Sequence, residues 1–66
     1  MSYDHIQQLR NHAVHTAQQA DHLTGVWLNT HDYADGQAAH GALAIADQAA
    51  QELRRAVHTA VTGSVN

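Results

Sequence analysis

Apolar residues recur on a helical period through most of this chain, and that spacing limits what it can fold into. Between Asp32 and Val61 they alternate at steps of three and four residues, as in an amphipathic helix: Leu43, Ala46, Ala50, Leu53, Val57 and Ala60. At about 1.5 Å per residue, such a helix would be roughly 45 Å long. A helix of that length cannot bury its own apolar face in a chain of 66 residues, so it needs a partner of similar length.

The preceding part of the chain supplies that partner. The same alternation is found at Ile6, Leu9, Ala13, Thr16, Ala20 and Leu23. We predict a first helix over about residues 3–24, with Ser2 as its N-cap. Gly25 is expected to end this helix, because glycine readily adopts the positive φ of a helix C-cap, and a loop is expected over about residues 25–30.

A second helix is predicted over about residues 31–62, with a loose tail at 64–66. The expected fold is therefore all-α, a single antiparallel helical hairpin over residues 1–66.

The apolar face of the second helix is wider than one neighbouring helix requires. A second row at seven-residue spacing, Ala42, Ala49 and Ala56, lies beside the first. A face this wide is typical of a helix in a four-helix bundle, so we expect two hairpins to pair as a homodimer. The core expected for this dimer consists of Leu9, Ala13, Ala20, Leu43, Ala46, Ala50, Leu53 and Val57.

Composition and charge argue against several classes of protein. The net charge is −3 with histidine neutral, and arginine supplies all three positive charges, so no nucleic-acid partner is expected. The absence of cysteine excludes disulfides and thiolate metal sites. No run of about 18 apolar residues is present, and the first residues lack the order of a signal peptide, so we expect a cytoplasmic protein without a membrane partner. Abundant alanine without lysine is typical of GC-rich bacterial genomes.

Catalysis is not expected either. Ser2 and Ser64 lie at the chain ends, and Glu52 is the only glutamate. Neighbours such as Asp21 and His22 project about 100° apart on a helix, so they do not form an acid–base dyad. We therefore predict no catalytic residues, no enzymatic activity and no cofactor.

Histidine is the one compositional extreme, with seven in 66 residues. Three interpretations remain open: polar surface residues, pH sensing and transition-metal binding. Protonation of all seven would raise the formal charge by seven units, from −3 to +4. The weak metal candidates His12, His15, His22 and His40 do not follow the spacing of a zinc site. No metal site is assigned, and metal binding is an alternative function.

Val26, Trp27 and Leu28 are unusually apolar for the expected loop. They are interpreted as a plug over the end of the hairpin or, alternatively, as an exposed patch for a partner protein. Together with Ile45, they are the residues expected to remain available to another protein after dimerisation. The predicted function is a non-enzymatic interaction or regulatory module that acts as a homodimer and binds an unidentified protein.

In size and expected architecture the chain resembles the small plasmid-encoded Rop protein, a helical hairpin that pairs into a four-helix bundle. The resemblance implies RNA binding through a basic face on the paired first helices. Here the first helix carries Arg10 alone, so Rop-like RNA binding is only the second alternative function.

Overall fold

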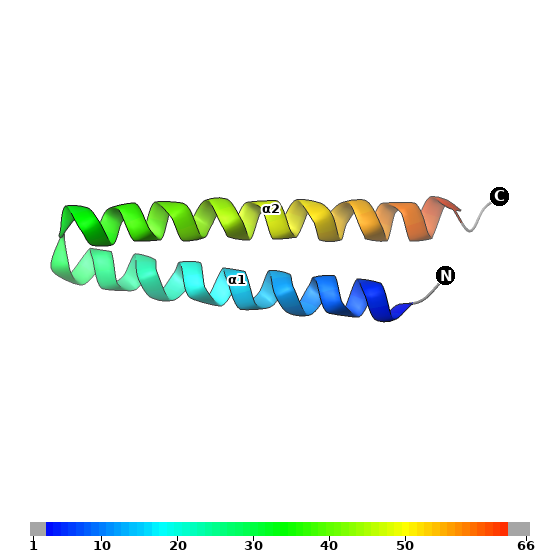
Figure 1. Cartoon of the computed structure of the whole chain (residues 1–66), viewed down its shortest axis with the longest axis horizontal. Helices are drawn as coiled ribbons and strands as arrows, with labels where there is room; N and C mark the ends of the chain where they lie inside the picture. The colour runs from blue at the N-terminus through cyan, green and yellow to red at the C-terminus, as the bar shows by residue number, and fades with distance from the viewer. Residues whose placement is uncertain (1–2, 64–66) are drawn as a thin grey trace.

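The computed structural model describes residues 3–63, which form two long helices, α1 (Tyr3–Thr30) and α2 (Tyr33–Gly63). The helices lie side by side and antiparallel, joined by a short turn (Figure 1). The molecule is a rod with extents of 52 × 15 × 12 Å. This arrangement confirms the predicted all-α helical hairpin. The predicted cap at Ser2 and the predicted tail at 64–66 lie outside the described residues. Neither helix within residues 3–63 is both long enough and apolar enough to cross a membrane.

Each helix contributes one stripe of side chains to the contact between them, which we call the seam. On α1 the seam follows the predicted spacing, and its residues are buried or half-buried: Ile6, Leu9, Ala13, Thr16, Ala20 and Leu23. On α2 the buried and half-buried residues also alternate at steps of three and four: Ala39, Ala42, Ala46, Ala49, Leu53, Ala56 and Ala60. Stripes with this spacing favour helices that pack at a shallow angle of about 20°.

The α2 seam differs from the row on which the sequence prediction centred. Leu43 and Val57 belong to that row, but α1 lies against the alanines beside them. As a result Leu43 is 47% exposed and Val57 41% exposed in the single hairpin. Small side chains at the centre of the seam let helix axes approach to about 8 Å, whereas leucine or valine at those central positions would hold them further apart. Close packing of α1 on α2 therefore leaves the larger side chains at the flank of the seam.

The centre of the seam consists almost entirely of methyl groups. Ala20, Ala39 and Ala49 are the buried apolar residues of the described chain, and each is at most 3% exposed. Thr16 is buried near them, and its hydroxyl donates a hydrogen bond to the carbonyl of Ala13 at 3.0 Å. Burial of one methyl group stabilises a fold far less than burial of a leucine side chain. A single hairpin therefore has a thin core.

Helix α1 continues through the residues that were expected to form the loop. Gly25 has no positive φ, and residues 25–30 are helical. The predicted loop and the predicted end of the first helix are therefore wrong. A glycine inside a helix costs only about 1 kcal/mol relative to alanine. Trp27 continues the seam spacing and packs against Gly36, and this packing favours a longer helix over an early cap.

Two residues, His31 and Asp32, reverse the chain. His31 has a φ of 54°, the left-handed conformation that commonly follows the end of a helix. Asp32 caps α2, because its carboxylate accepts a hydrogen bond from the Ala34 N–H at 3.3 Å. The Thr30 hydroxyl donates to the Asp35 carboxylate at 2.6 Å and accepts from the Asp32 N–H at 3.3 Å. Polar side chains rather than glycine therefore fix the turn.

The left-handed conformation of His31 generates a first prediction. We expect His31→Gly to raise the free energy of unfolding by about 0.5–1 kcal/mol. Glycine removes the steric penalty of the positive φ, and the greater conformational entropy of glycine in the unfolded chain offsets part of this gain. His31→Val should lower it by about 1–3 kcal/mol, because a β-branched side chain strains this conformation. Thermal denaturation at one fixed protein concentration measures both; equal melting temperatures for the two variants would contradict the turn geometry.

Candidate functional site

The seam separates two broad faces of the hairpin. On α2, one side of the seam carries Gly36, Leu43, Ala50 and Val57, and the other carries Ile45, Glu52 and Thr59. Contacts between the helices assign the sides of α1. Trp27 lies against Gly36, whereas His5 lines a groove with Glu52 and Thr59, and Gln19 lines a second groove with Ile45.

The first side is unusually apolar, and we define it as the apolar face: Val14, Ala17, Trp27, Leu43, Ala50 and Val57. Four of these are large hydrophobic side chains that solvent reaches, with exposed fractions from 39% for Trp27 to 47% for Leu43. Arg10 and Arg54 flank the face near the chain termini, Asp47 flanks it near the middle, and Asp21 flanks it near the turn. Monomeric globular proteins rarely leave large apolar patches exposed, and such patches commonly mark binding sites.

Trp27 lies at the turn end of the apolar face. Its ring stacks so closely on Gly36 that a Cβ at that position would meet the indole Nε1 at 2.9 Å. Tyr33, Gln37 and His40 join these two residues around a hollow of about 370 Å³. The predicted plug is therefore a ring that rests on the first turns of α2, with part of its surface in solvent.

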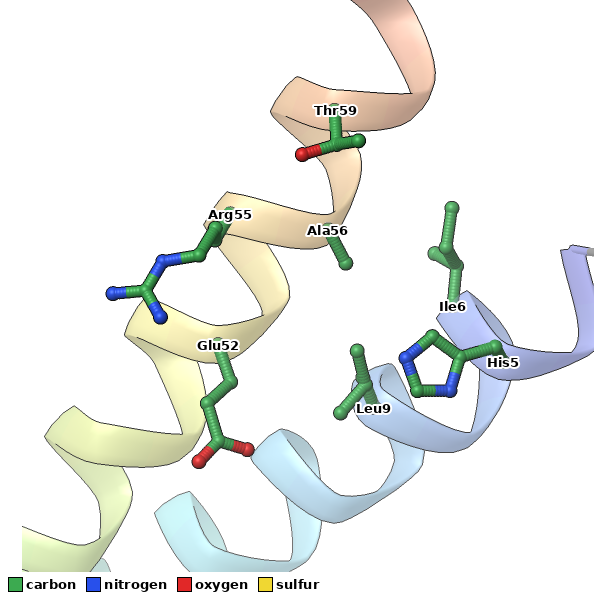
Figure 2. A pocket seen from close by; sticks show the side chains of 7 residues that line it. All are labelled: His5, Ile6, Leu9, Glu52, Arg55, Ala56 and Thr59. Carbon is green, nitrogen blue, oxygen red and sulfur yellow. The ribbon is translucent and has the colours of Figure 1, made fainter. Parts of the chain in front are cut away.

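The second side is more polar, and we define it as the polar face: His5, His15, Gln19, His22, Ile45, Glu52 and Arg55. A groove of about 530 Å³ lies on this face near the chain termini. Figure 2 shows Ile6 and Leu9 of α1 and Ala56 of α2 pointing into the space between the two helices, while the Arg55 guanidinium points away from them. The groove has an apolar floor and charged edges.

The structure separates the four histidines that were the weak metal candidates. His15 and His22 line one shallow groove with Gln18 and Gln19, whereas His40 lies beside Trp27 at the other face. His12 is exposed on α1. Within residues 3–63, no group of three or more His, Cys, Asp or Glu side chains is placed to hold a metal ion.

The residues expected to bind a partner fall on different faces. Trp27 belongs to the apolar face and Ile45 to the polar face, where Ile45 is 56% exposed. Val26 is half-buried, and Leu28 is exposed at the end of α1. The expected dimer core also divides: Ala20 is already buried in the single hairpin, Leu43 and Val57 are exposed, and the others are half-buried, namely Leu9, Ala13, Ala46, Ala50 and Leu53.

Sequence reasoning did not identify Gly36 as a contact of Trp27, nor the groove between His5 and Thr59. The seven-residue spacing of Gly36, Leu43, Ala50 and Val57 was visible and could have placed Gly36 in the same row. The groove joins residues from the two ends of the chain, and no local pattern links them.

Comparison with protein-family models, with curated proteins and with solved structures finds no match to this chain.

The contact between Trp27 and Gly36 generates a second prediction, in which Gly41 is a matched control. Apart from its own stretch of helix, nothing lies within 4 Å of a Cβ built at Gly41, so Gly41→Ala should stabilise the protein by up to about 1 kcal/mol through helix propensity. At Gly36 the new methyl would displace the indole, so Gly36→Ala should show a smaller gain or a loss.

Urea denaturation measures the stability of both variants, and the wavelength of Trp27 fluorescence reports the position of the ring. We expect a shift in emission for Gly36→Ala only. An equal gain in stability for the two variants, with unchanged emission, would show that the ring does not rest on Gly36.

Proposed function

We propose that this protein is a non-enzymatic interaction or regulatory module that works as a homodimer, in which a second hairpin covers the apolar face and completes a four-helix bundle. One observation carries the proposal: the larger apolar side chains lie exposed beside a core made of alanine. Leu43 and Val57 are both more than 40% exposed, while Ala20, Ala39 and Ala49 are buried.

The energetic reason is the size of the core. A single hydrophobic core rarely stabilises a chain of fewer than about 70–80 residues by more than 3–5 kcal/mol. Alanine contributes less to this stabilisation than the larger apolar residues do. Complete burial of a leucine or valine side chain is worth about 1.5–3 kcal/mol. Leu43 and Val57 are already more than half buried, so covering both adds roughly 1–3 kcal/mol per copy, a large addition to so thin a core.

The polar face supports the second part of the proposal, the binding of another protein. The polar face remains exposed to solvent when the apolar face is covered. Among the described residues of the polar face, Ile45 is the large apolar residue that is exposed. Beside Ile45, a shallow hollow of about 210 Å³ is lined by His15, Thr16, Gln19 and Ala42. An isolated aliphatic side chain with polar neighbours is a suitable anchor for a modest protein–protein contact.

Leu43 and Ile45 form a matched pair for a third prediction, because both are exposed aliphatic residues on α2 but lie on opposite faces. Leu43→Glu should lower the dimer affinity at least about 100-fold, since it places a charge in the apolar contact. Ile45→Glu should leave the dimer affinity within about threefold of the native value. Sedimentation equilibrium measures both affinities, and capture of partner proteins should be reduced by Ile45→Glu.

A native chain that sediments as a monomer at every concentration would refute the homodimer. Loss of dimer by both variants would place the interface elsewhere. Partner capture that is unchanged by Ile45→Glu would remove the polar face from the proposal while leaving the homodimer in place.

A further inference from the structure

We infer that the second copy lies on the apolar face with its turn at the opposite end of the bundle. Each α2 then packs along the partner's α2, each α1 packs along the partner's α1, and the two-fold axis runs between the two hairpins, perpendicular to the helices and level with their middle. The inference rests on the proposed homodimer and adds its orientation.

The size of the face fits one second copy. The hairpin is 52 Å long and 15 Å wide, so its broad side has a projected area of about 780 Å². Stable protein–protein interfaces bury about 800 Å² on each partner. A second hairpin of equal length covers this face end to end, which a shorter segment could not do.

The steric pattern along α2 favours the antiparallel orientation. The row Gly36, Leu43, Ala50 and Val57 alternates small and large residues at seven-residue spacing. When α2 packs antiparallel on its copy about a centre between Ala46 and Asp47, Leu43 lies opposite the partner's Ala50. Large side chains then fill the space left by small ones, as close packing requires.

The same centre places Val57 opposite the partner's Gly36. The indole of Trp27 rests on that glycine and is 39% exposed. Val57 therefore meets an apolar ring instead of a charged or polar group, and the contact covers the exposed part of the ring. Small residues of the row therefore lie opposite large residues of the partner's row along its whole length.

The charges of the two halves favour the same orientation, and the two Asp47 side chains beside the two-fold axis are a like-charge contact that opposes it. Asp21, Asp32 and Asp35 lie in the half of the hairpin near the turn, which contains no arginine. The half near the termini contains all three arginines and the remaining three carboxylates, so the formal charges of the halves are −3 and 0 with histidine neutral. Opposite placement of the turns brings each acidic half onto the half with the arginines.

One charge pair is specific to α1. Arg10 lies seven residues before Ala17 and Asp21 lies four residues after it. With α1 antiparallel on its copy about Ala17, Arg10 is offset from the partner's Asp21 by only about 4.5 Å along the axis. Within the described chain, neither side chain forms an ion pair with another residue of the same hairpin. The dimer supplies each with an opposite charge.

The competing orientation places both turns at the same end, with α1 packed on the partner's α2. Because the hairpin is antiparallel, Arg10 lies at nearly the same height as Arg54. Arg10 would then face the partner's Arg54, and the acidic turns would lie side by side. Like charges in such contacts oppose association.

Distances between spin labels distinguish the two orientations. The native chain has no cysteine, so Asn29→Cys and Gln18→Cys each provide one labelling site on an exposed part of α1. In the proposed dimer the two Asn29 sites lie about 36 Å apart along the bundle, whereas the two Gln18 sites, close to the axis, lie about 3 Å apart in that direction. Pulsed electron paramagnetic resonance should give a distance between the two Asn29 labels that is at least about 10 Å longer than the distance between the two Gln18 labels.

Each outcome has one meaning. A longer Asn29 distance supports the inference. Equal distances at the two sites in a confirmed dimer overturn the orientation and leave the homodimer standing. A monomer in sedimentation overturns both.

Charge reversal tests the pairing independently. At low ionic strength Arg10→Asp and Asp21→Arg should each weaken the dimer by about tenfold, because each replaces two attractions across the two-fold axis by repulsions. The double variant keeps the net charge and reverses the pair, so its affinity should return to within about threefold of the native value. Tighter association of Arg10→Asp would overturn the inference, since only the competing orientation places Arg10 against the partner's Arg54.

Discussion

The close approach of α1 and α2 through alanine is the interaction on which the rest of this structure depends. Ala20, Ala39 and Ala49 are buried near the centre of the seam, where small side chains permit a short distance between the axes, whereas larger seam residues such as Leu9 and Leu53 lie away from the centre. Leu43 and Val57 lie beside the seam. The contrast between an apolar and a polar broad face follows from this narrow contact, because the large residues displaced from it are found mainly on one side.

The spacing of apolar residues was sufficient to predict the hairpin and the seam of α1, since only one face of that helix has a complete alternation of threes and fours. It was insufficient at the turn. Gly25 has the residue type of a helix cap, but a cap requires a positive φ, and the packing of Trp27 on Gly36 extends the helix instead. The hydrogen bond from Thr30 to Asp35 joins two helices across the turn, and periodicity within one helix carries no information about it.

The candidate surfaces were partly predictable for a related reason. Helix α2 has two neighbouring rows with heptad spacing, and the sequence identifies both without deciding which one faces α1. That choice depends on the distance between axes, which is a property of two helices together. Ile45 was recognised because it is a large residue outside both rows. The groove between His5 and Thr59 was not, because it forms only when the two ends of the chain meet.

The turn also determines that α1 packs on α2 of its own chain. If residue 31 adopted a right-handed helical φ, α1 and α2 could join into one straight helix of roughly 90 Å. The seam stripe of α1 would then be covered by α2 of a different chain, and two molecules would exchange their second halves. The left-handed backbone at His31 and the cap at Asp32 oppose that domain swap, so these two adjacent residues favour packing of α1 on α2 of the same chain.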